Sequence, residues 1–110
     1  MLNKDLIAAS STQLILSILA KEESYGYDII QRIRTLSNDQ MIWSDGMLYP
    51  LLHRLEKDGL VSSKWRTAES GRKRKYYRIN NKGKVALKEA RNQWLIVHDT
   101  LTKLWEVSYA

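Results

Sequence analysis

The sequence has no cysteine and no phenylalanine, and its 110 residues include a single proline. The lack of cysteine excludes disulfides, zinc–thiolate sites and thiol nucleophiles together. No apolar run approaches the roughly 18 residues that a membrane-spanning helix needs. The apolar residues near the N-terminus are periodic and are interrupted by Asp5, which does not fit a signal peptide. We therefore expect a cytoplasmic protein that has no membrane partner.

Patterns typical of enzymes are missing as well. The sequence has no P-loop, no GxGxxG motif, no defensible Ser-His-Asp order and no pair of carboxylates in an apolar setting. The two histidines, His53 and His98, lie far apart, and a lone histidine without partner ligands seldom binds a metal. We expect a protein that is not an enzyme and that has no cofactor and no metal.

The composition is that of a folded domain with a basic surface. Hydrophobic residues make up 44% of the chain and charged residues 27%, which favours a globular protein over a disordered one. The net charge is +6. A domain of this size with such a charge often binds nucleic acid, although a basic surface that only aids solubility is an equal alternative. The position of the charges has to decide between them.

Apolar periodicity predicts two helices in the first third of the chain. Residues 4–20 repeat apolar side chains at steps of three and four, as a core helix does. Residues 25–37 repeat the pattern, with Ser24 as the expected N-cap and "SNDQ" as the terminating turn. The short stretch "MIW" at 41–43 could add one brief strand.

The stretch "SDGMLYPLLHRLEKDG", residues 44–59, predicts a third helix. Four leucines at i, i+3, i+4 and i+7 give it one buried face, and Gly59 is a natural residue to end it. Pro50 cannot donate a hydrogen bond to the carbonyl of Gly46. We therefore expect an irregular or 3₁₀-like first turn, followed by a regular helix from about Leu48.

The rest of the chain predicts a β-hairpin and a long helix. The runs "LVSSKWRTA" and "RKRKYYRIN" flank a turn at "ESG", and strand alternation places one of Tyr76 and Tyr77 in the core. Asn80 is expected to cap a helix that reaches about Tyr109. The predicted fold is mainly α with a small β-hairpin (α+β): a winged helix-turn-helix DNA-binding domain over residues 1–79 and a dimerisation helix over residues 80–110.

Positive charge is concentrated on the predicted hairpin. "RKRKYYR" at 72–78 carries five cations, and the partner strand adds Lys64 and Arg66. Such a cluster is expected where an anion offsets the repulsion, and a DNA backbone supplies that anion. A solvated edge strand that lysine and arginine protect from aggregation is the alternative. We favour DNA because the cluster is so dense.

The helix over residues 44–58 is the expected recognition helix. N-terminal residues of such a helix contact bases, and later cations meet phosphates. Amides behind the N-cap can face a phosphate, and a glycine lets the backbone approach it. For Tyr25, at the start of the preceding helix, a phosphate contact and core packing are equally good explanations. The predicted DNA-binding residues are Tyr25, Ser44, Asp45, Gly46, Met47, Tyr49, His53, Arg54, Lys64, Ser70, Gly71, Arg72, Lys73, Arg74 and Lys75.

The final helix carries apolar residues at alternating steps of three and four, the seam of a helix that pairs with another helix. Two copies of Trp94, one from each subunit, could anchor the dimer interface. Alternatively, they could line a pocket with Val97 that binds a flat apolar ligand, and the two roles are compatible. The predicted dimerisation residues are Leu87, Ala90, Trp94, Val97, Leu101, Leu104 and Trp105.

Four stretches resemble the PadR family of bacterial transcriptional regulators in its short form. They are "YGYDIIQRI", "LYPLLHRLEKDGLVSSKW", "SGRKRKYYRIN" and the start of the last helix around Gly83, and the resemblance that they carry extends over nearly the whole chain. The resemblance implies a homodimeric winged helix-turn-helix repressor and a palindromic operator. Some short members bind flat aromatic compounds beside a tryptophan of the last helix, and Trp94 falls at the matching place. Members often read Ser-Pro-Gly-Thr-Leu-Tyr where this chain reads "SDGMLY", so Asp45 and Met47 leave the operator sequence open.

The expected function is that of a homodimeric DNA-binding transcriptional regulator, a repressor that binds a palindromic operator in double-stranded DNA. A small planar aromatic effector bound at the dimer interface would release it. Two alternatives are a dimeric winged-helix module that binds protein and a drug-sequestering protein without specific DNA binding. The tyrosine, histidine, arginine and lysine on the outer face of the recognition helix favour DNA.

Overall fold

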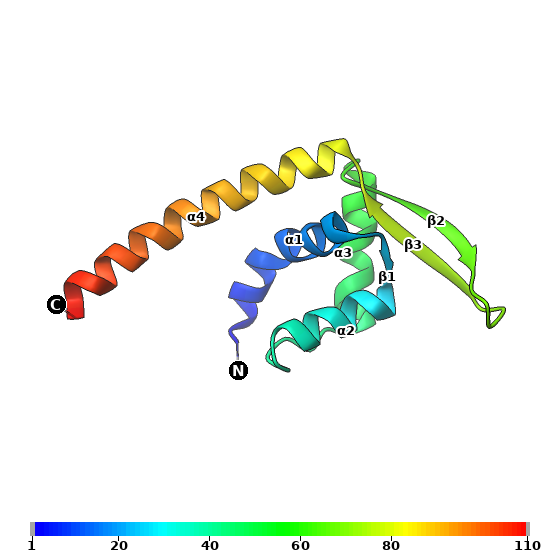
Figure 1. Cartoon of the computed structure of the whole chain (residues 1–110), viewed down its shortest axis with the longest axis horizontal. Helices are drawn as coiled ribbons and strands as arrows, with labels where there is room; N and C mark the ends of the chain where they lie inside the picture. Colours follow the sequence, from blue (N-terminus) through cyan, green and yellow to red (C-terminus); the bar gives the residue numbers. More distant parts are fainter. Residues whose placement is uncertain (1, 110) are drawn as a thin grey trace.

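Residues 2–109 of the chain are described by a computed structural model, and within them the chain forms four helices and three strands. In chain order the elements are α1 (Lys4–Lys21), β1 (Ser24–Tyr25), α2 (Gly26–Leu36), α3 (Asp45–Lys57), β2 (Val61–Thr67), β3 (Lys73–Ile79) and α4 (Asn81–Tyr109). In Figure 1, α1, α2 and α3 form the body, the β2–β3 hairpin extends from one side and α4 from the other. The predicted mainly α fold with a β-hairpin is confirmed.

The core lies between the three N-terminal helices and the base of the hairpin. The periodic apolar residues supply most of it, and the predicted buried face of α3 is confirmed. Tyr77 is the buried tyrosine of the adjacent pair, while Tyr76 is only partly buried, as strand alternation requires. The buried hydrophobic residues are Ile15, Leu16, Ile18, Leu19, Ile29, Ile33, Trp43, Leu48, Leu51, Leu52, Leu55, Val61 and Tyr77.

The sheet has a third strand that the sequence did not predict. The strand order is β1-β3-β2, both pairs are antiparallel, and β1 pairs Ser24 with Tyr77 and Tyr25 with Tyr76. The suggested strand at 41–43 is wrong, since those residues form no strand and belong to the loop between α2 and α3. Ser24 is also not the N-cap of α2. It is buried in β1 and donates its hydroxyl to Asp28, and Tyr25 takes the N-cap position without a side-chain cap.

The start of α3 is regular, contrary to the prediction. The helix begins at Asp45, and the amide of Leu48 donates to the carbonyl of Ser44 over 3.1 Å. Ser44 caps the helix by accepting from the amide of Met47. Pro50 removes only the bond to the carbonyl of Gly46, and Gly46 is exposed, so water can solvate that carbonyl. The cap and the buried Leu48 are enough to hold the first turn.

The turns that link α3 to the hairpin and the hairpin to α4 follow the prediction. Gly59 ends α3 with φ of +78°, and the amide of Leu60 donates to the carbonyl of Leu55 over 2.9 Å. The side chain of Asn80 accepts from the amide of Gly83 over 3.1 Å and caps α4. A Cβ on Gly83 would lie 3.0 Å from the carbonyl carbon of Leu60, so glycine lets α4 approach the start of the hairpin.

Beyond its first turns, α4 leaves the body of the protein. The molecule is 59 Å long, and α4 accounts for much of that length. Several large apolar side chains of α4 are exposed, among them Trp94, Val97 and Trp105. None of the helices within residues 2–109 combines the length and the apolar character that crossing a membrane requires.

Candidate nucleic-acid interface

The N-terminus of α3 presents free backbone amides to solvent. The first amides of a helix have no partner within it, and here Ser44 accepts from the amides of Met47 and Leu48 but not from those of Asp45 and Gly46. A Cβ on Gly46 would meet nothing closer than the Ser44 hydroxyl at 3.7 Å, so packing within the chain does not require glycine there. Met47 is 45% exposed. These residues form an accessible helix end that can accept an anion.

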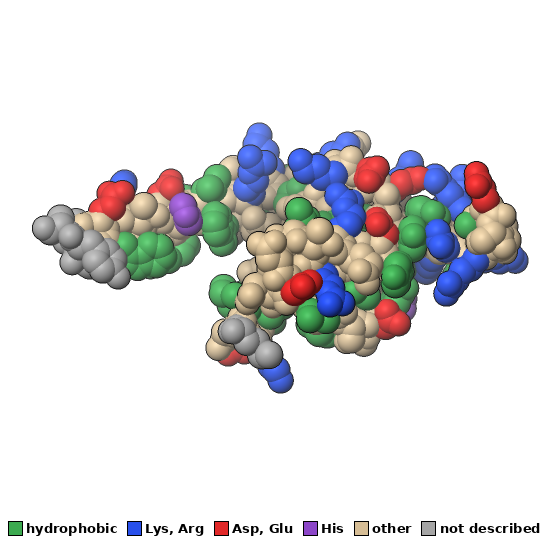
Figure 2. All heavy atoms as spheres, turned by 60° about the horizontal axis from the view of Figure 1, so that its bottom comes forward, with side chains coloured by type: hydrophobic (Ala, Val, Ile, Leu, Met, Phe, Trp, Pro, Cys, Tyr) green, Lys and Arg blue, Asp and Glu red, His purple; other side chains and the backbone are tan. Residues whose placement is uncertain are grey.

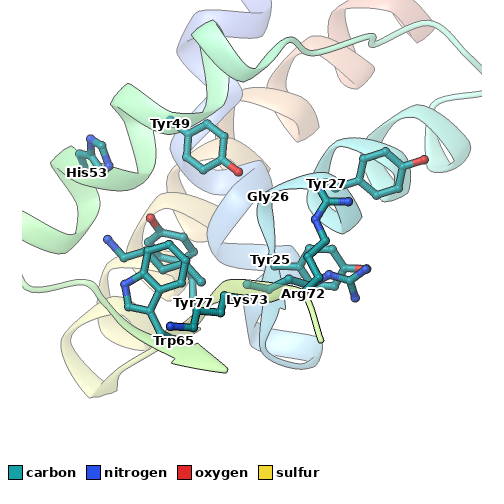
Figure 3. A pocket seen from close by; sticks show the side chains of 11 residues that line it. Tyr25, Gly26, Tyr27, Tyr49, His53, Trp65, Arg72, Lys73 and Tyr77 are labelled. Carbon is teal, nitrogen blue, oxygen red and sulfur yellow. The ribbon is translucent and has the colours of Figure 1, made fainter. Parts of the chain in front are cut away.

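Tyr49 connects the outer face of α3 to the start of α2. A Cβ on Gly26 would lie 2.7 Å from the Cζ atom of Tyr49, closer than real Cβ contacts. A side chain at position 26 would therefore have to displace the tyrosine ring, which covers the first turn of α2. Figure 3 shows the hydroxyl of Tyr49 pointing toward Gly26, with His53 one turn further along α3. Tyr49 remains 36% exposed, so part of its ring is accessible between the two helices.

The face of the hairpin that carries Tyr76 holds a stack of aromatic rings and guanidinium groups. The rings of Tyr25 and Tyr76 meet edge to face with centroids 5.2 Å apart. The guanidinium of Arg74 lies 4.4 Å from the Tyr25 centroid, and that of Arg66 lies 5.0 Å from the Tyr76 centroid. Arg66 also pairs with Glu23. Tyr25 is thus a partly buried ring that supports the guanidinium of Arg74.

Strand alternation divides the cations of the hairpin between two faces. Lys73 and Lys75 share a face with the buried Tyr77, and Trp65 lies opposite Lys75 in the ladder. Arg74 is on the other face, opposite Arg66. In Figure 2, Lys and Arg side chains gather around the hairpin, and hydrophobic side chains line one side of α4.

Glu56 ties the hairpin to α3. Its carboxylate accepts from the hydroxyl of Ser63 and lies 3.9 Å from the Nζ atom of Lys75. Beside it, the hydroxyl of Tyr77 is buried and finds no hydrogen-bond partner among the described residues. Burial, with smaller contributions from Glu56 and Tyr49, raises the pKa of Tyr77 above its ordinary value of 10.0. The contacts of Glu56 with Ser63 and Lys75 thus hold the hairpin against α3.

An open cleft of about 550 Å³ separates α3 and the start of α2 from the hairpin. Its walls combine aromatic rings with the cations of the hairpin (Figure 3). Four residues that line it were not predicted as site residues: Gly26, Tyr27, Trp65 and Tyr77. Side chains that line it include Tyr49 and His53 of α3, Tyr27 of α2, and Trp65, Arg72 and Lys75 of the hairpin.

The structure brings most of the predicted DNA-binding residues to one side of the molecule. Tyr25, Tyr49, His53 and the cations 72–75 share the cleft. Ser44, Asp45, Gly46 and Met47 form the neighbouring end of α3, and Ser70 and Gly71 form the exposed hairpin turn. Lys64 lies apart, on the other face of β2 opposite Tyr76, and Arg54 is exposed on α3.

The predicted dimerisation residues divide into two groups. Leu87 packs against the core of its own chain, and Ala90 is partly buried, so the start of the seam is largely occupied. Further along α4 the seam residues are exposed. The ring of Trp94 stacks on His98 with centroids 4.9 Å apart and borders a small cleft of about 240 Å³ with Leu14 of α1.

No group of three or more His, Asp or Glu side chains that could hold a metal occurs in the described part of the chain.

Comparison with known proteins identifies the family. Residues 15–89 match the model of the Transcriptional regulator PadR-like family. An uncharacterized protein X of Lysinibacillus sphaericus is 31% identical over 106 residues, which cover 96% of this chain and 97% of that protein. The transcriptional regulator YqjI of Escherichia coli is 33% identical over 82 residues, 74% of this chain but only 34% of YqjI. A PadR-like transcriptional regulator of Bacillus cereus has a similar structure, with a TM-score of 0.82, 31% identity, and coverage of 93% of this chain and 97% of that one. YqjI and the Bacillus cereus protein are both named as transcriptional regulators, and the chain belongs to the PadR-like family of transcriptional regulators.

Proposed function

We propose that this PadR-like regulator is a homodimeric repressor that binds a palindromic operator with α3 and the β2–β3 hairpin. The observation that carries the proposal is the arrangement around the cleft. The outer face of α3, the start of α2 and the basic end of the hairpin all face the same space. A helix flanked by a basic hairpin is the geometry with which winged helix-turn-helix proteins contact a groove and the adjoining backbone.

In this proposal α3 lies in the major groove and the hairpin forms the wing. Met47, near the accessible end of the helix, contacts base edges, and its thioether suits the methyl group of thymine. The free amides at Asp45 and Gly46 face a phosphate. Arg72, Lys73, Arg74 and Lys75 meet the backbone and supply affinity that depends on salt and little on sequence.

The second part of the proposal is a dimer formed through α4. Val97 and Leu101 expose apolar side chains along one seam, and Trp105 continues it. Exposed apolar residues spaced in this way suit an interface between two helices. A two-fold dimer places two copies of α3 in successive major grooves, which is the reason for a palindromic operator.

Ligand release is the third part. Trp94 borders a small cleft with Ser10, Leu14 and Ser17 of α1, and it remains 49% exposed. In a dimer, the second subunit would close this cleft, and a planar aromatic compound could stack on the indole. Such a compound acts as an inducer only if it binds better to the free than to the DNA-bound arrangement of the two subunits.

The first experiment measures binding of the full chain to the DNA upstream of its own gene and to random duplex. The expected result is a preference for the upstream DNA and a steep loss of affinity with salt. Equal binding to both duplexes, or binding without salt dependence, would refute operator recognition. Sedimentation at several protein concentrations tests the dimer, and a reporter fused to the bound promoter tests repression.

The alternatives give different results in the same assays. A drug-sequestering protein would bind a planar dye with quenching of Trp94 and would ignore DNA. A protein-interaction module would bind neither. The cations around the cleft favour DNA over both.

A further inference from the structure

Trp65 is a large apolar side chain of the hairpin that is 64% exposed. It belongs to the same face of β2 as Val61, and strand alternation turns this face toward the body of the protein. Val61 is buried, whereas Trp65 lies four residues further out, beyond the edge of the core. A tryptophan side chain has about 150–250 Å² of surface that burial can remove from water. Most of it stays in water in the single chain.

The surroundings of Trp65 show what kind of partner would cover it. The indole lines the main cleft together with Tyr49 and His53 of α3. It also lines a more open hollow together with Lys73 near the end of the hairpin. In the ladder Lys75 lies directly opposite Trp65. The exposed ring is therefore a flat apolar surface beside two lysines of β3.

A single strand of a DNA backbone has the matching chemistry, because it alternates phosphates with apolar sugar faces. The strand that separates a major groove from the neighbouring minor groove passes between a recognition helix and its wing. Figure 3 shows the indole of Trp65 on the hairpin side of the cleft, across from His53. An acidic peptide also supplies negative charge, but it does not alternate anions with apolar rings at regular intervals as a DNA strand does.

We infer that Trp65 is a DNA-contacting residue, which packs its indole on a deoxyribose of the strand that runs through the cleft while Lys73 and Lys75 pair with the flanking phosphates. The inference rests on the proposed DNA binding and adds a residue and a kind of contact to it. The indole contributes affinity that does not depend on base sequence and, unlike the lysines, does not depend on salt.

The test compares Trp65→Ala, Trp65→Phe and Lys73→Ala with the unchanged protein, on the upstream duplex and on a random duplex over a salt series. Trp65→Ala should weaken binding to both duplexes by about tenfold at every salt concentration, while the slope of log K against log salt stays the same. Trp65→Phe should recover part of that loss because it keeps an apolar ring. Lys73→Ala should instead reduce the slope by about 0.9. Leu36→Ala, which removes an exposed apolar side chain at the end of α2, is the matched control and should bind normally.

A fluorescence measurement keeps the inference testable if Trp65→Ala does not fold. Iodide should quench the unchanged protein less when the duplex is bound, and this protection should be much smaller in Trp65→Phe. Equal protection in the two proteins, or Trp65→Ala that binds as tightly as the unchanged protein, would overturn the role of Trp65 while leaving the proposed function intact. Protection by polyglutamate equal to that by DNA would overturn the assignment to DNA. Failure of the unchanged protein to bind any duplex would instead refute the proposed function.

Discussion

The contact between Tyr49 and the first turn of α2 makes a sharp prediction about glycine. Gly26→Ala places a methyl group where the Tyr49 ring now lies, since the Cβ would be 2.7 Å from the Cζ atom. Either the ring moves or α2 shifts against α3. Overpacking of this kind typically costs about 1–3 kcal/mol. For a chain of this size that corresponds to a fall in Tm of roughly 4–12 °C.

Gly46→Ala is the matched control, because it adds the same methyl group to another helical glycine. Nothing lies closer than 3.7 Å to a Cβ at that position, and alanine is the better helix former. Gly46→Ala should therefore be neutral or stabilise the fold by up to about 1 kcal/mol. Its effect should instead appear in DNA binding, where the added methyl group stands between the amides and a phosphate. Thermal unfolding followed by circular dichroism at one protein concentration measures both variants.

A double-mutant cycle then tests whether Tyr49 is the obstacle. In a Tyr49→Ala background the added methyl group at position 26 no longer meets the ring that supplies its three nearest atoms, so Gly26→Ala should cost less than about 0.5 kcal/mol, well below its cost alone. An equal cost in both backgrounds would refute the reasoning. It would mean that the backbone of α2, and not the tyrosine ring, excludes a side chain there.

Three further predictions concern the hairpin and α4. Because the pKa of Tyr77 is raised in the folded state, the unfolded chain loses this proton first, so stability should be complete below about pH 10 and fall as the pH rises through the folded pKa. Tyr77→Phe should remove this alkaline loss, and unfolding in denaturant between about pH 9 and 11 measures it. Arg74→Ala should weaken binding to all duplexes alike and reduce the salt slope by about 0.9, and a change in base preference would contradict the assigned contact. Leu101→Asp should shift the dimer to monomer in sedimentation without lowering the Tm of the isolated subunit, because Leu101 is 39% exposed in the single chain; an unchanged dimer would place the interface elsewhere.

The sequence predicted the elements whose signals are local. The leucine spacing predicted the buried face of α3, Gly59 predicted its end, and Asn80 predicted the cap of α4. Each prediction depends on only a few neighbouring residues, and each is confirmed. The charge cluster likewise located the hairpin as the basic element. These features depend on periodicity, cap chemistry and turn geometry, which a single chain displays without knowledge of its neighbours.

The features that the sequence did not predict depend on contacts between distant segments. Ser24 and Tyr25 form a strand only because β3 lies beside them. A strand of two residues is too short to be predicted from its own sequence. The need for Gly26 appears only once Tyr49 is placed over it. Strand alternation predicts that Trp65 lies on the inward face of β2. It does not show that the core ends before Trp65, so the exposure of the indole could not be predicted. For the contact between Gly26 and Tyr49, the only local signal in the sequence was a glycine between two tyrosines, "YGY".

The pairing of Arg66 with Arg74 across the ladder shows how the hairpin is prepared for an anion. Like charges directly opposite in a sheet are destabilising, and a structural edge strand would avoid them. Here each guanidinium rests on a tyrosine ring, and Arg66 also pairs with Glu23. Arg74 has the Tyr25 ring beneath it and is only partly buried, so its charge remains available at the surface. The arrangement holds a cation in a fixed place at some cost to the free protein, which is reasonable where an anionic partner offsets that cost on binding.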